Sequence, residues 1–149
     1  MCIRDRYQIE FDHAAIGRQT MTCERLTPET FATEIAPART FGFLADLEAL
    51  RAAGLAGGAS LENTLVYDDE GPVGDVPLRF DDECVRHKAL DLIGDLALMG
   101  GPLRAFVTAH LAGHRLHQAL VHALHEKLSG PDTEGADVSA SSREGDVAS

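Results

Sequence analysis

The sequence is poor in cysteine, in basic residues and in long apolar runs, and each shortage excludes a class of protein. Its three cysteines, Cys2, Cys23 and Cys84, follow neither a disulfide nor a metal-site spacing, which favours a reducing cytosol. Lysine and arginine number 13 against 24 acidic residues, and the net charge of −11 argues against a nucleic-acid partner. No apolar run is long enough for a transmembrane segment, and the charged residues 3–6 do not fit a secretory signal.

The rest of the composition predicts one folded domain followed by a polar tail. Hydrophobic residues make up 44% of the 149 positions, which is enough for a core. Residues 1–6 show no structural pattern, so we expect an artefact or a disordered start. Residues 7–128 carry the periodic patterns of a domain. Residues 129–149 are rich in Ser, Gly, Asp and Glu and predict a disordered tail.

Strands and helices are expected in an irregular order. Alternating or short apolar runs predict strands over residues 7–12, 18–26, 61–67 and 103–109. Helical periodicity with start and stop signals predicts helices over residues 29–36, 44–53, 81–99 and 115–128. Residues 38–43 are expected to form a turn between two helices. Without regular strand–helix alternation, an α+β fold is favoured over a doubly wound α/β fold.

The segment 85–95 carries the most informative chemical pattern. On a helix, His87 and Asp91 face the same way, about 6 Å apart along the axis, and both side chains are good zinc donors. Asp95 lies about 12 Å from His87 by the same rise, which suits an orienting role better than coordination. From the pair alone, an ion-paired helix face is the commoner interpretation. Two donors are also too few for a catalytic zinc, which usually takes three protein ligands.

The remaining histidines leave alternatives open. His114 follows Gly113 and opens the last expected helix, where the helix dipole disfavours an imidazolium and a nearby carboxylate would favour it. A histidine between these influences suits acid–base catalysis near neutrality, although a surface histidine is the commoner case. A stripe of His110, His114 and His117 would suit metal storage, but Gly113 interrupts a continuous helix there.

In their order and spacing, these segments resemble one family from residue 7 to about residue 128. The matching stretches are residues 9–13, 34–43, 54–58, 63, 78–83, 85–88, 91, 93–96 and 113–114. The set is similar to the UDP-3-O-acyl-N-acetylglucosamine deacetylases, zinc-dependent enzymes of lipid A biosynthesis in Gram-negative bacteria. The resemblance implies the second of two similar α+β domains. Each is a two-layer domain, with a small mixed or antiparallel sheet packed on helices.

The resemblance also implies a role for each matching residue. His87 and Asp91 would bind Zn²⁺, while the third ligand and the glutamate general base would belong to an N-terminal domain absent from this chain. Thr40 and His114 would stabilise the oxyanion, and Asp95 would orient His114, which protonates the leaving amine. Lys88 would contact the nucleotide part of the substrate, and Phe41 and Phe43 would line the cleft. The acyl chain would be contacted by Leu44, Leu47, Ala56, Ser60 and Val66.

Three positions depart from the family pattern without removing a catalytic group: Ala59 in place of glycine, Leu111 where some members have lysine, and His117 in place of asparagine. The resemblance thus implies a cytoplasmic zinc amidohydrolase that acts on UDP-3-O-acyl-N-acetylglucosamine. We expect it to be a monomer at full length and this fragment to be inactive alone. The alternative is a non-catalytic metal-binding module that uses His87, Asp91 and the C-terminal histidines.

Overall fold

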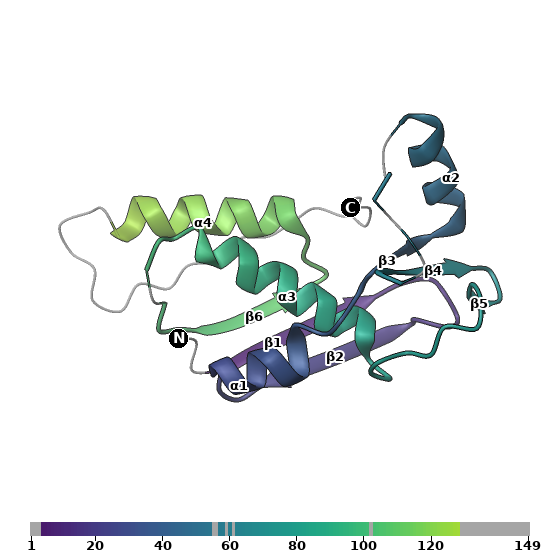
Figure 1. Ribbon diagram of the computed structural model, residues 1–149. Helices are drawn as coiled ribbons and strands as arrows, with labels where there is room; N and C mark the ends of the chain where they lie inside the picture. Colours follow the sequence, from purple (N-terminus) through teal and green to yellow (C-terminus); the bar gives the residue numbers. More distant parts are fainter. Residues whose placement is uncertain (1–3, 55–56, 59, 61, 102, 129–149) are drawn as a thin grey trace.

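The protein forms two small sheets with helices packed against them, as the computed structural model in Figure 1 shows. The structure describes residues 4–54, 57–58, 60, 62–101 and 103–128. The predicted tail at residues 129–149 lies outside the described residues. Within the described residues, no helix is long and apolar enough to cross a membrane.

The first sheet has the strand order β2-β1-β6. Strand β1 (Arg4–Glu10) runs antiparallel to β2 (Arg18–Cys23) and parallel to β6 (Phe106–His110). The second sheet has the order β3-β4-β5. In it, β4 (Thr64–Asp68) runs parallel to β3 (Thr40–Phe43) and antiparallel to β5 (Gly71–Pro72). Both sheets are therefore mixed, and the predicted α+β class is confirmed.

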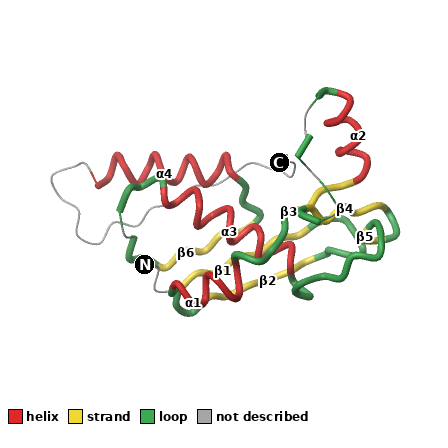
Figure 2. Tube along the Cα trace, in the orientation of Figure 1, coloured by secondary structure: helices red, strands yellow, loops and turns green. Residues whose placement is uncertain are grey.

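The helices lie in three separate places in the fold (Figure 2). Helices α3 (Glu83–Ala97) and α4 (His114–Leu128) pack on each other, and α3 lies across β1 and β2. Helix α1 (Pro28–Thr30) continues directly into the π-helical turn η1 (Phe31–Ile35). Helix α2 (Leu44–Ala52) contacts β3 and β4 and projects from the far end of the molecule (Figure 1).

Two expectations about local structure are corrected. Residues 38–43 were expected to be a turn, but Thr40–Phe43 forms strand β3, paired with β4 from Thr40↔Thr64 to Phe43↔Tyr67. No structural pattern was expected before Tyr7, but Arg4–Arg6 belongs to β1 and pairs with both neighbouring strands. Neither segment shows a strand pattern by itself, because pairing with neighbouring strands determines its extended conformation.

The core lies between the sheets and one face of α3. Alternate side chains of β1 enter it from Tyr7 and Ile9, as a half-buried strand requires. Helix α3 contributes a stripe at helical spacing, consisting of Val85, Ala89, Leu92 and Leu96. The burial of this stripe leaves the flanking face of α3, with His87, Asp91 and Asp95, only partly covered.

A tight connection brings the start of α4 next to the end of α3. After β6, Leu111 adopts the left-handed backbone conformation (φ 51°), and its N–H donates to the Gln8 carbonyl. Ala112 is buried, and α4 begins at His114 after Gly113. The connection therefore interrupts the histidine stripe at Gly113, as predicted, and it places His114 beside α3.

Candidate active site

His87 and Asp91 point toward each other from successive turns of α3. His87 Nε2 lies 3.3 Å from Asp91 Oδ1, and both side chains are mostly buried, at 17% and 15% exposed. On its other side, His87 Nδ1 lies 3.1 Å from the Ala38 carbonyl oxygen. Because a carbonyl only accepts, the proton belongs on Nδ1, which leaves the Nε2 lone pair free. An imidazole held in this way is ready to bind a metal through Nε2.

A second cluster forms where the first turn of α4 meets α3. Asp95 Oδ2 lies 2.7 Å from His114 Nδ1 and 2.8 Å from His117 Nδ1. His114 Nε2 in turn lies 3.9 Å from Asp91 Oδ2, so the two clusters adjoin. The structure thus brings together four predicted residues from two helices: His87, Asp91, Asp95 and His114.

His117 is a member of this cluster that sequence analysis did not assign to the site. Its side chain is 2% exposed, and its Nε2 lies 2.7 Å from the Tyr7 hydroxyl. Burial lowers the pKa of His117, although the hydrogen bond and the charge of Asp95 act in the opposite direction. The Tyr7 hydroxyl is itself buried beside Ala112 O, at 2.9 Å, and burial raises its pKa above the usual range. The only sequence signal was His117 standing three residues after His114, on one face of the helix.

Two sets of side chains are candidates for holding a metal ion. Among the described residues, one group of three donors lies close enough together, namely Asp95, His114 and His117. However, both ring nitrogens of His117 already have hydrogen-bond partners, Tyr7 and Asp95, so a metal ion there would have to displace one of these hydrogen bonds. His87 Nε2 and the Asp91 carboxylate fit a metal better, because the ring is oriented from behind by a carbonyl. That pair needs a further donor to complete a tetrahedral site.

A buried ion pair fixes the strand that borders this site. Arg39 donates from Nε and NH2 to the two Glu83 oxygens at 2.9 and 3.0 Å, and its backbone N–H donates to Oε1 at 2.9 Å. Glu83 is the first residue of α3 and Arg39 directly precedes β3, so the pair joins the start of that strand to the helix that carries His87. Ala38 and Thr40 flank Arg39 directly. The exposed Thr40 therefore begins β3 two residues after the carbonyl that orients His87.

The predicted nucleotide and cleft residues lie on the same side of α3. Lys88 Nζ is 3.8 Å from Asp91 Oδ2 and 6.0 Å from the centre of the Phe41 ring. Phe41 and Phe43 are partly buried, and both pack against Phe11, edge-to-face and tilted respectively, with ring centres 5.4 and 5.9 Å away. The rings thus form a partly exposed aromatic wall beside Lys88.

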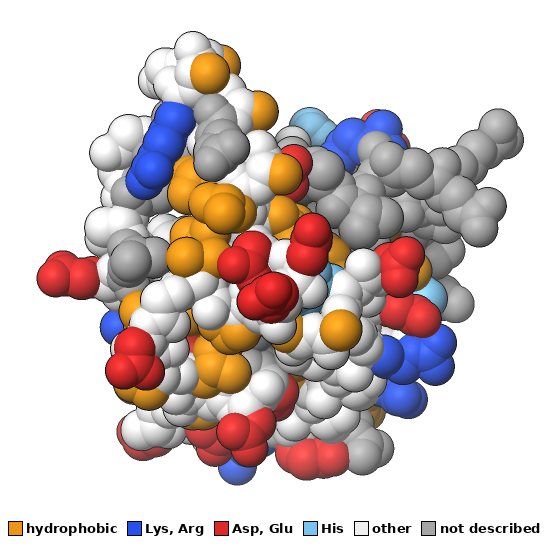
Figure 3. Space-filling view, turned by 90° about the vertical axis from the view of Figure 1, so that its right-hand side faces the viewer, with side chains coloured by type: hydrophobic (Ala, Val, Ile, Leu, Met, Phe, Trp, Pro, Cys, Tyr) orange, Lys and Arg blue, Asp and Glu red, His pale blue; other side chains and the backbone are white. Residues whose placement is uncertain are grey.

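The predicted acyl-chain residues are placed around α2 and β4. Val66 is buried on the face of β4 opposite to Leu65 and Tyr67, while Leu44 and Leu47 of α2 are half-buried. Ser60 is exposed, and Ala56 lies outside the described residues. Figure 3 shows hydrophobic side chains gathered at the surface below the projecting top of the molecule. An apolar surface of this kind suits contact with a hydrocarbon chain.

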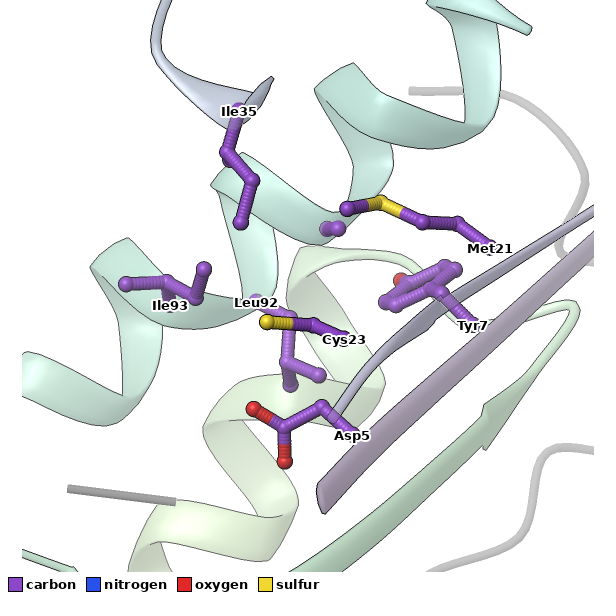
Figure 4. Close-up of a pocket in the computed structure, with 8 residues that line it drawn as sticks. Asp5, Tyr7, Met21, Cys23, Ile35, Leu92 and Ile93 are labelled. Atoms are coloured by element: carbon purple, nitrogen blue, oxygen red, sulfur yellow. The ribbon is translucent and has the colours of Figure 1, made fainter. Parts of the chain in front are cut away.

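A small cavity elsewhere in the fold shares Tyr7 with the second cluster. It lies between α3 and the strands β1 and β2, and Figure 4 shows the mainly apolar side chains around it. It is lined by Asp5, Tyr7, Met21, Cys23, Ile35, Ala89, Leu92 and Ile93. None of the predicted site residues lines it, so the candidate site is defined by the polar clusters and not by this cavity.

Fold and clusters together define an α+β domain whose central helix presents imidazole and carboxylate groups suited to metal binding and proton transfer. A family model described as UDP-3-O-acyl N-acetylglycosamine deacetylase matches residues 2–126. The chain belongs to this family.

Curated relatives agree with this assignment. The chain is 52% identical over 128 residues to the UDP-3-O-acyl-N-acetylglucosamine deacetylase of Oleidesulfovibrio alaskensis, covering 85% of this chain and 42% of that protein. It is 48% identical over 124 residues to the protein of that name from Leptospira biflexa, covering 83% and 40%. The match to Thermosynechococcus vestitus is 52% over 122 residues, covering 82% and 41%. The chain thus spans about two fifths of the length of the curated relatives it matches.

Proposed function

We propose that this chain supplies part of the active site of a zinc-dependent deacetylase that removes the N-acetyl group from UDP-3-O-acyl-N-acetylglucosamine in lipid A biosynthesis. The observation that carries the proposal is that two pairs, His87–Asp91 and His114–Asp95, meet at the Asp91 carboxylate. His87 lies 3.3 Å and His114 lies 3.9 Å from the oxygens of Asp91. The His87–Asp91 pair suits metal binding and the His114–Asp95 pair suits proton transfer. Zinc-dependent hydrolysis of an amide needs both.

His87 and Asp91 would hold the zinc ion, with a third ligand and the general base contributed by the remainder of the enzyme, in an N-terminal domain. When bound, zinc activates water and polarises the amide carbonyl. The share of the relatives' length that this chain covers, about two fifths, supports a division of the site between two parts. The alternative cluster at Asp95 is less suitable for the ion, because both ring nitrogens of His117 already have hydrogen-bond partners.

His114 would act as the acid that stabilises the oxyanion and protonates the leaving amine. Its Nδ1 is held by Asp95 at 2.7 Å, so Nε2 is the atom free to face the substrate. The Thr40 hydroxyl at the start of β3 would donate a hydrogen bond to the same oxyanion. A preorganised donor of this kind needs no reorientation as charge develops on the oxygen.

The substrate would lie along the partly exposed side of the site. Lys88 would contact the diphosphate or nucleotide as a cation, with Phe41 and Phe43 along the cleft wall. The acyl chain would follow the apolar surface from Leu44 and Leu47 toward Val66, with Ser60 near its path. Ala56 stays a predicted acyl-chain contact outside the described residues. We further propose that the complete enzyme is a cytoplasmic monomer. This chain alone should be inactive, because it lacks the base and a zinc ligand.

The proposal is tested in the complete enzyme that carries this domain, by measuring acetate release and zinc content together. We expect His114→Gln to lower kcat by about 10²- to 10⁴-fold while zinc stays bound. We expect His87→Ala to lose zinc and activity together. His122→Gln is the control, because His122 is exposed on the same helix α4, and it should change neither quantity.

The alternative, a non-catalytic metal-binding module, predicts the opposite pattern. In a module that uses the C-terminal histidines, His114→Gln would lower the metal content, and no acetate would be released by any variant. Robust turnover by the isolated 149-residue chain would refute the division of the active site between two domains.

A further inference from the structure

The His114 side chain lies at the surface, and a single short polar contact orients it. It is 49% exposed, and its nearest polar partner among the described residues is Asp95 Oδ2, 2.7 Å from Nδ1. An exposed imidazole rotates freely unless it is held, and rotation would turn Nε2 away from the substrate. The orientation of His114 therefore depends on how firmly Asp95 is itself held.

Asp95 is held from the protein interior by a second imidazole. His117 Nδ1 lies 2.8 Å from Oδ2, the same oxygen that binds His114, and His117 is 2% exposed. His117 Nε2 contacts the Tyr7 hydroxyl at 2.7 Å, and Tyr7 is a core residue of β1 at 2% exposure. A continuous line of hydrogen bonds thus runs from the core strand through two helices to the exposed imidazole.

The protons of this line can be assigned from the groups present. If His117 is neutral, the acceptor-only Asp95 carboxylate favours the proton on Nδ1, which donates a hydrogen bond to Asp95, while Nε2 accepts a hydrogen bond from the Tyr7 hydroxyl. If His117 is charged, it donates from both nitrogens, and Tyr7 donates to the Ala112 carbonyl oxygen, 2.9 Å away. Asp95 therefore accepts a hydrogen bond from His117 Nδ1 in both states. Tyr7 makes this possible, because its hydroxyl can both donate and accept.

We propose that His117, locked by Tyr7, is a positioning residue that holds Asp95 and thereby aims His114 at the substrate. This inference rests on the proposed deacetylase function, in which His114 is the acid. His117 itself does not reach the reacting atoms. Its contribution is to fix one rotamer of the Asp95 carboxylate by a second donor on the oxygen that His114 uses.

The first test compares two substitutions of His117 in the complete enzyme. His117→Leu removes both hydrogen bonds, and we expect kcat to fall about 10- to 100-fold with little change in KM or zinc content. His117→Asn places an amide N–H close to the original Nδ1, so it should recover most of the lost kcat. His122→Leu, on the exposed side of the same helix, is the matched control and should leave kcat unchanged. A general loss of folding would lower zinc content in the leucine and asparagine variants alike.

The second test does not depend on activity. In the complete enzyme with ¹⁵N-labelled histidine, the His117 Nδ1 proton should appear as a downfield, slowly exchanging NMR signal. This signal should disappear in Asp95→Asn and in His117→Leu and should persist in His122→Leu. It remains measurable if the enzyme proves to have another substrate, so failure of the proposed function and failure of this inference are distinguishable.

Two results would overturn the inference. One is an unchanged kcat in folded His117→Leu, or an equal loss in His117→Asn and His117→Leu. The other is the absence of a protected His117 Nδ1 proton in the wild-type enzyme. If His117→Leu does not fold, Tyr7→Phe replaces it. That variant should broaden or lose the signal and lower kcat, and unchanged values of both would contradict the role of Tyr7.

Discussion

Replacing Arg39 by methionine tests how a buried ion pair stabilises this fold. Arg39 is 7% exposed and Glu83 is 1% exposed, and the guanidinium donates to both carboxylate oxygens. Methionine fills much of the space but leaves the carboxylate with only the backbone N–H groups of Arg39 and Arg79. Breaking a buried pair on one side costs about 3–5 kcal/mol. We expect that loss in the free energy of unfolding at neutral pH, a large share of a typical domain's stability.

The contribution of Glu83 to the pH dependence of the free energy of unfolding should also change sign in this variant. In the wild type, burial pushes the pKa of Glu83 upward, but hydrogen bonds from Arg39 and the backbone outweigh it, so the pKa lies below its usual value. The contribution of Glu83 is therefore present above the ordinary glutamate pKa and is lost as the pH falls through the lowered one. Without the guanidinium, burial dominates and raises the pKa. The variant should then gain stability on acidification through that raised range and lose it as the pH rises.

Urea unfolding, followed from neutral pH toward acid, measures both effects. Arg18→Met is the control, because Arg18 and its partner Glu10 are 64% and 47% exposed, and such pairs contribute about 1 kcal/mol or less. The reasoning would be refuted if Arg39→Met cost no more than the control. It would equally be refuted if the variant lost stability on acidification in parallel with the wild type.

Three further predictions concern single positions. Leu111→Gly should leave the free energy of unfolding unchanged or raise it by up to about 1 kcal/mol in urea titrations, because glycine relieves the left-handed conformation at φ 51°; a clear loss would contradict this. Cys84, whose burial raises its pKa to about 11, should react with iodoacetamide at mildly alkaline pH far more slowly in the native than in the unfolded protein; equal rates would argue against its burial. Thr40→Val should lower kcat about 10²- to 10³-fold in acetate-release assays with zinc retained, and an unchanged kcat would remove Thr40 from the oxyanion site.

Long elements with a clear hydrophobic periodicity were predictable from the sequence. The apolar stripe of α3 and the stop at Gly100 predicted a helix over residues 81–99, and the structure has Glu83–Ala97. Strand β3 was not predictable, because Thr40–Phe43 is short and its partner β4 begins at Thr64. A strand of this length is determined by pairing and not by its own pattern.

The candidate site likewise has one part that the sequence predicts and one part that depends on tertiary contacts. The relation of His87 to Asp91 follows from helix geometry alone, and their 3.3 Å separation agrees with it. The part played by His117 depends on Tyr7, 110 positions away, and on a turn that brings α4 onto α3. The Arg39–Glu83 pair likewise joins residues 44 positions apart. Contacts of this kind are determined by tertiary packing and cannot be predicted from the spacing of residues along the chain.

The central claim is that the metal ion belongs to His87 and Asp91 and that His114 and Asp95 remain free for proton transfer. Anomalous X-ray diffraction at the zinc edge, on crystals of the complete enzyme, locates the ion directly. We expect one zinc peak bonded to His87 Nε2 and the Asp91 carboxylate, with His114 Nδ1 still hydrogen-bonded to Asp95. A peak enclosed instead by Asp95, His114 and His117 would contradict it.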